Sequence, residues 1–108
     1  MEMRLTFVPP GGGEADYEIS VDLPAVPQPG DYIKIWRKDM PDQKGSFDFI
    51  ARRTWWDIKV EENGQTAGEF LVECEYALSG MSAPGHVETC KGYEGAGLKP
   101  KCLDDSAF

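Results

Sequence analysis

Residues 23–31 constrain the fold of this chain more than any other segment. They read Leu-Pro-Ala-Val-Pro-Gln-Pro-Gly-Asp, with three prolines among nine residues. Proline cannot donate to a sheet ladder and breaks the interior of a helix. Gly30 can adopt a positive φ, which lets the chain turn into a new strand. We therefore interpret this segment as a corner between two strands, and it predicts a small β-barrel or sandwich.

Alternation of apolar and polar side chains predicts strands on both sides of this corner. Asn63-Gly64 is typical of a tight hairpin turn between the last two strands. The apolar parity changes between Ala51 and Trp56, which predicts a β-bulge near residues 52–54. The predicted strands cover residues 1–7, 15–23, 32–37, 46–60 and 70–78.

These strands predict an all-β fold, a small SH3-like or otherwise partly open β-barrel of about five strands formed by residues 1–78. Residues 79–108 are rich in Gly and Pro, and no part of them has clear helical periodicity. We expect a loop-rich C-terminal arm there. It packs on the barrel, is mobile, or docks onto a second copy of the chain as a homodimer contact.

The chain of 108 residues carries a net charge of −8. This charge argues against nucleic acid as a partner and suits a basic one. Acidic residues occupy alternate, outward positions between residues 1 and 22 and between residues 57 and 75, so both regions are expected to present acidic surfaces. Such surfaces are either solvated outer faces or patches that meet a basic protein.

An aromatic and basic group is the strongest candidate for a binding surface. Adjacent Trp55 and Trp56 point to opposite sides of a strand, so only one of them is expected in the core. Two interpretations stay open, namely packing with arginine stacking and a recognition surface for a protein or small ligand. The candidate residues are Tyr32, Trp36, Arg37, Arg52, Arg53, Trp55 and Trp56.

The three cysteines and the single histidine offer weaker alternatives. His86, Cys90 and Cys102, with Cys74 as a fourth ligand, do not match the spacing of a closed zinc site, so no metal is expected. A Cys90–Cys102 disulfide would close the C-terminal arm in an oxidising compartment. The odd cysteine count instead favours a reducing compartment, and we expect the cytoplasm.

Catalysis has little support in the sequence. His86 has no accompanying nucleophile motif such as Gly-x-Ser-x-Gly, and residues 11–13 form a glycine turn without a Walker lysine. No segment has the length of a membrane span, and the N-terminus lacks the pattern of a signal peptide. We therefore expect a protein that is not an enzyme, binds no cofactor and has no membrane partner.

The segment Leu-Pro-Ala-Val-Pro-Gln-Pro-Gly-Asp-Tyr-Ile, with a following aromatic strand and Arg53-Thr54-Trp55, resembles uncharacterised short bacterial and phage-borne proteins. These proteins belong to mobile elements, including integron cassettes, and have a Pro-x-x-Gly-Asp motif that leads into an SH3-like barrel. The resemblance covers about residues 20–78. It implies a fold and a genomic setting, but no activity.

Together these features predict a non-enzymatic small binding module that recognises a protein or small ligand through its aromatic and arginine surface. The alternative is an acidic inhibitor carried by a mobile element, of the anti-defence or immunity type, that acts by charge mimicry.

Overall fold

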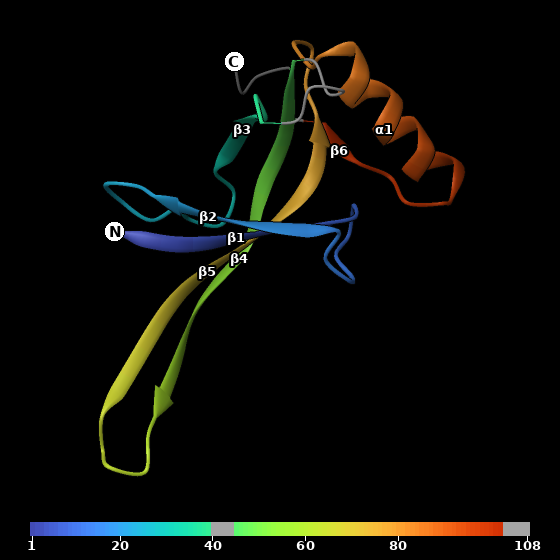
Figure 1. Cartoon of the computed structure of the whole chain (residues 1–108). Coiled ribbons are helices and arrows are strands. Elements are labelled where there is room, and N and C mark those ends of the chain that lie inside the picture. Colours follow the sequence, from blue (N-terminus) through green and yellow to red (C-terminus); the bar gives the residue numbers. More distant parts are fainter. Residues whose placement is uncertain (40–44, 103–108) are drawn as a thin grey trace.

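The computed structural model describes residues 1–39 and 45–102, and five strands of this part form one sheet curled into an open half-barrel (Figure 1). The strand order is β2-β1-β5-β4-β3, and a short sixth strand pairs with the end of β5. The prediction of a small, partly open β-barrel is confirmed. The elements are β1 (Glu2–Val8), β2 (Tyr17–Asp22), β3 (Tyr32–Trp36), β4 (Ser46–Val60), β5 (Thr66–Leu78), α1 (Pro84–Gly95) and β6 (Lys101–Cys102).

The first strand lies inside the sheet. β1 and β2 form the expected antiparallel hairpin, in register from Glu2 opposite Asp22 to Phe7 opposite Tyr17. The other edge of β1 pairs in parallel with β5, starting where Met3 lies opposite Phe70. This central position explains why β1 is buried on both faces from Leu5 to Val8, whereas the edge strand β2 is only partly buried.

The core occupies one face of the curled sheet, which we call the inner face. Alternate residues of β1, β4 and β5 supply it, with aromatic rings in contact at its centre: Phe7 and Phe49 have ring centroids 4.5 Å apart. The fully buried members of this cluster include Met3, Leu5, Phe7, Phe49, Val72, Cys74 and Cys90.

The proline-rich corner returns the chain from β2 to the far side of the sheet. The Leu23 N–H donates to Met1 O, and the corner ends where Gly30 N–H donates to Ala51 O and Ala51 N–H donates to Asp31 O. Gly30 has a φ of 97°, as the turn into β3 requires. The corner therefore places β3 beside β4.

The long β4–β5 hairpin extends well beyond the other strands (Figure 1). The register shifts between Ala51 and Arg53, which confirms the predicted bulge. The turn at Asn63-Gly64 is also confirmed, with a φ of 84° at Gly64. β3 pairs with β4 only as far as Ile50 and β1 pairs with β5 only from Phe70 onward, so the strand residues between 57 and 69 pair only with each other among the described residues. We call residues 53–70 the projecting hairpin.

The prediction of a loop-rich C-terminal arm is wrong for residues 84–95, which form α1. The helix has Pro84 in its first turn. It buries His86 and Cys90 and partly buries Tyr93 on one side, at the i, i+4, i+7 spacing of a helical face. Three glycines in the helix obscured this pattern in the sequence. In the described part of the chain, no helix is long and apolar enough to cross a membrane. Residues 103–108 of the predicted arm lie outside the described residues.

Candidate binding surface

The predicted aromatic and basic residues fall on both faces of the sheet. We call the face of the sheet away from the core the outer face. Before the bulge, Ile50 and its partner Glu75 lie on the outer face, and after the bulge Trp55 and its partner Leu71 lie on it. Register with β3 puts Tyr32 opposite Ile50, so Tyr32 also lies on the outer face. Trp56 points to the inner face. The sequence predicted that the two tryptophans face opposite sides, but the expectation that one of them lies in the core is wrong, because Trp56 lies beyond the buried part of the inner face and both are exposed.

Arg52, Arg53, Trp55 and Glu73 form one group on the outer face, which we call the outer cluster. Glu73 Oε2 accepts from Arg52 Nη1 at 2.8 Å and lies 2.9 Å from Arg53 Nε, and Glu73 Oε1 accepts from Arg53 Nη2 at 3.3 Å. The Arg53 guanidinium lies over the Trp55 ring, 5.4 Å from its centroid. The bulge makes this possible, because it directs two consecutive arginines toward one carboxylate.

Trp36 lies far from the outer cluster although it shares the same face. It is exposed and opposes Ser46 at the start of β4, nine residues before Trp55. That separation is about 25–30 Å along an extended strand. Tyr32 lies between them, and its hydroxyl donates to Asp48. The structure therefore does not bring Trp36 and Trp55 into one site.

Arg37 and Trp56 are separated from the outer cluster by the sheet itself. The Arg37 guanidinium lies 5.2 Å from the centroid of the Tyr17 ring and forms an ion pair with Asp39 at 2.9 Å. The hydrogen bond with Arg37 lowers the pKa of the Asp39 carboxyl. Trp56 packs edge-on against Phe70, with centroids 4.8 Å apart, and stays more than half exposed.

Two acids that the sequence placed on a solvated outer face are buried. Glu73 and Glu75 point outward as predicted, but their exposures are 5% and 1%. The arginines of the outer cluster cover Glu73. Glu75 accepts from Gly11 N–H at 2.7 Å and pairs with Lys101 Nζ at 2.7 Å. The prediction of exposed acids is therefore wrong at these two positions, because loops and β6 cover this part of the face.

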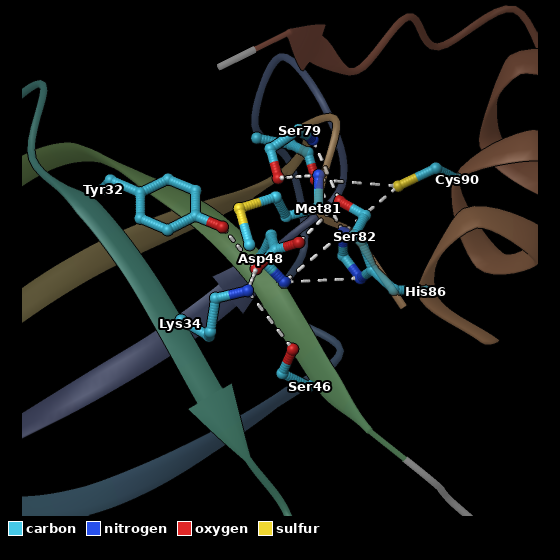
Figure 2. A network of polar contacts seen from close by, with 10 residues as sticks. Tyr32, Lys34, Ser46, Asp48, Ser79, Met81, Ser82, His86 and Cys90 are labelled. Carbon is cyan, nitrogen blue, oxygen red and sulfur yellow. Dashed lines mark hydrogen bonds and ion pairs between the residues drawn. The ribbon is translucent and has the colours of Figure 1, made fainter. Parts of the chain in front are cut away.

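A buried polar network lies at the other end of β4, centred on Asp48 (Figure 2). The Asp48 carboxylate accepts from Tyr32 Oη at 2.6 Å and from Ser82 Oγ at 2.5 Å, and Lys34 Nζ lies 3.2 Å away. Burial alone would raise the pKa of Asp48, but these two hydrogen bonds and the lysine hold it below its ordinary value. Asp48 thus ties β3 and the segment before α1 to β4.

His86 and Cys90 attach α1 to the inner face near this network. His86 Nε2 lies 2.6 Å from Ala77 O, and its ring stacks on Tyr76. Cys90 Sγ lies 3.6 Å from His86 Nε2. Burial raises the pKa of the Cys90 thiol to about 11, so it is not a thiolate at neutral pH. A buried thiol and a buried imidazole in this arrangement anchor the helix rather than form a nucleophilic pair.

The cysteines are all free in the structure. Cys74 and Cys90 are buried, whereas Cys102 is exposed on β6, so the Cys90–Cys102 disulfide is not formed. Within residues 1–39 and 45–102, no three His, Cys, Asp or Glu side chains lie together in a way that could hold a metal ion.

Comparisons with protein-family models, with curated proteins and with solved structures found no match to this chain. The inference of function therefore depends on the arrangement of the side chains.

Proposed function

We propose that this protein is a non-enzymatic binding module that recognises a partner protein through the outer cluster. The observation that supports this is an exposed arginine that lies over an exposed tryptophan and is paired with the buried Glu73 carboxylate. Tryptophan and arginine dominate the energetics of protein interfaces. Because the ion pairs already fix the arginines, little side-chain entropy is lost when a partner binds.

The location of the outer cluster favours a protein over a small ligand. Sites for small molecules enclose most of the surface of their ligand. Arg53 and Trp55 stand at the base of the projecting hairpin, where the Arg53 side chain is 65% exposed. At this position β1, β5 and β4 lie side by side, and the face of an open sheet can lie against the surface of another protein. Three free thiols suit a reducing compartment, and we place this activity in the cytoplasm.

Capture from the source cell followed by affinity measurement tests this proposal. The chain is immobilised, retained proteins are identified, and the Kd of each is measured for the wild type, Trp55→Ala and Arg53→Ala. We expect the tryptophan variant to bind its partner about 10–100-fold more weakly, as is typical of a central interface residue. The arginine variant should also bind more weakly, because the stacked pair is lost.

Trp36→Ala is the matched control, because it removes a tryptophan that is even more exposed than Trp55 from the same face at a distant position. It should leave the Kd unchanged. If all three variants unfold at the wild-type temperature and Trp55→Ala binds with wild-type affinity, the outer cluster is not the binding surface. Loss of binding in Trp36→Ala alone would move the surface to the end of β3.

One observation favours the second function, an acidic inhibitor that acts by charge mimicry. Acidic residues stay exposed along the edge strand β2 and the turn before it, at Glu14, Asp16, Glu18 and Asp22. Binding of a basic protein to this edge would weaken steeply with salt, because exposed charges are screened. Binding through the outer cluster would depend on salt only weakly. A salt series on the captured partner therefore separates the two functions.

A further inference from the structure

The outer edge of β4 in the projecting hairpin is unpaired. β3 covers β4 only from Ser46 to Ile50, and the proline-rich corner bonds Ala51. From Arg53 to Val60, no described residue pairs with this edge. A long unpaired edge is a template for another strand, and natural proteins normally protect it with bulges, prolines or a partner.

The inner face of the same hairpin is apolar and exposed. Trp56, Ile58 and Val60 are 55%, 63% and 70% exposed. Their cross-strand partners are Phe70, Gly68 and Thr66, so this face carries no ionisable side chain. A two-stranded hairpin is only marginally stable in water, and an additional strand pair on its edge would stabilise it.

The hydrogen-bond pattern identifies which backbone groups are available. Glu61 N–H donates to Gln65 O at the turn, so this pair is a hydrogen-bonded one. Such pairs alternate along an antiparallel ladder. Counting back along the register, Trp56, Ile58 and Val60 direct their N–H and C=O groups away from β5, toward the free edge. These are the same residues that form the apolar face.

We propose that a second copy of this chain pairs with this edge, with β4 antiparallel to β4 about a two-fold axis at Ile58. Trp56 of each copy then opposes Val60 of the other, and Ile58 opposes itself. These pairs would supply about six backbone hydrogen bonds. The result is a continuous four-stranded ribbon, β5-β4-β4-β5, whose apolar faces adjoin. The contact is isologous, as two-fold symmetry requires.

The charges select this register. With the axis at Ile58, Asp57 of each copy lies opposite Lys59 of the other, in the pairs whose side chains approach most closely. Asp57 and Lys59 are exposed and form no ion pair with any described residue. With the axis at Asp57, the two copies of Asp57 would lie opposite each other, and with the axis at Lys59 the two lysines would. With the axis at Trp56, Arg53 of each copy would lie opposite Lys59 of the other.

The length of the free edge also fits a second copy. In this register β4 of each copy ends at Val60, opposite Trp56 of the other copy, and its chain then turns back into β5. The strand pairing therefore lies within the free edge and ends before it reaches β3. The two acidic half-barrels lie at opposite ends of the ribbon, tens of ångströms apart. Charges at that distance are largely screened at physiological ionic strength.

Sedimentation velocity with charge-swapped variants tests the dimer. The chain has a mass of 12.0 kDa, and we expect twice that mass at micromolar to millimolar concentrations under reducing conditions, which prevent linkage through Cys102. Lys59→Asp should weaken the dimer about 10–50-fold, because two attractive pairs become two repulsive ones. Asp57→Lys should do the same.

Two matched experiments then restore opposite charges. The double variant Asp57→Lys/Lys59→Asp should regain the dimer, and an equimolar mixture of the two single variants should form a heterodimer. In the wild-type dimer, amide hydrogens of Trp56, Ile58 and Val60 should exchange slowly, and dilution should remove this protection.

A wild-type chain that stays at 12.0 kDa throughout this range overturns the proposal and leaves the edge to a strand from another protein. A dimer that both single variants retain at wild-type affinity also overturns it, because that dimer would use another surface. The outer cluster lies on the face opposite Trp56, Ile58 and Val60 and contributes none of the proposed strand pairs, so failure of the dimer would leave the proposed function untouched.

Discussion

Removal of the Asp48 carboxylate should destabilise the protein by about 3 kcal/mol. In Asp48→Ala, the hydroxyls of Tyr32 and Ser82 lose their acceptor, at about 1–1.5 kcal/mol each. The Lys34 side chain is 30% exposed, so water can replace the carboxylate and the loss there is at most about 0.5 kcal/mol. For a domain of this size, the total corresponds to a fall in Tm of roughly 10–20 °C.

Equilibrium urea unfolding, followed by tryptophan fluorescence, measures this loss. The midpoint should fall while the slope of free energy against urea stays constant, because the unfolded surface is unchanged. Glu88→Ala is the matched control, since Glu88 is an exposed acid that pairs only with Lys91 at 3.4 Å. It should change stability by less than about 0.5 kcal/mol. If Asp48→Ala matches this control, the network does not hold β3 and the segment before α1.

The lowered pKa of Asp48 predicts that the free energy of unfolding depends on pH. The folded pKa of Asp48 lies below its unfolded value, so its contribution is complete above the unfolded pKa, about 3.9. It is lost as the pH falls through the folded pKa. Asp48→Asn has no such proton to gain. The difference in unfolding free energy between the wild type and this variant should therefore be constant at neutral pH and shrink below about pH 4. A difference that grows on acidification would refute the assigned direction.

Three further predictions concern the turns, thiols and helix. Gly45→Ala should cost about 1–3 kcal/mol in urea unfolding, since Gly45 has a φ of 88° and a Cβ there would lie 2.7 Å from Ala83 Cβ. A thiol reagent at pH 8 should modify only Cys102 in the folded chain and all three cysteines in urea, because the other two are buried with raised pKa values. Tyr93→Phe should cost about 1 kcal/mol by removing the hydrogen bond to Asp16, and a calorimetric melt would measure it.

The sequence was sufficient to predict most of the sheet because alternation marks the face of each residue locally. The bulge after Ala51 was predictable because the parity of the apolar residues changes there. The parity of a strand residue does not say which other segments cover its face of the sheet. Glu73 and Glu75 are buried by residues distant in sequence, so their burial could not be predicted. Parity also gives no distance between two residues on the same face. Trp36 and Trp55 share a face, and only the register of β3 against β4 shows that they lie far apart.

The helix escaped prediction for a different physical reason. Gly85, Gly92 and Gly95 each disfavour a helix by about 1 kcal/mol relative to alanine, so local propensity argued against α1. Packing of its buried side against the core compensates for this. The spacing of His86, Cys90 and Tyr93 was a helical signal, but the first two were interpreted as metal, disulfide or catalytic candidates.

The position of β1 in the sheet has a consequence for folding kinetics. β1 lies between β2 and β5, and Met3 meets its partner Phe70 only after most of the chain has been synthesised. The β1–β2 hairpin can form early, but its second edge must wait for a contact of long sequence separation, and such contacts slow folding. During synthesis the apolar side chains of β1 are exposed to water and to chaperones for most of that time. Of the strands in this sheet, the first in sequence is therefore among the last to gain all its partners.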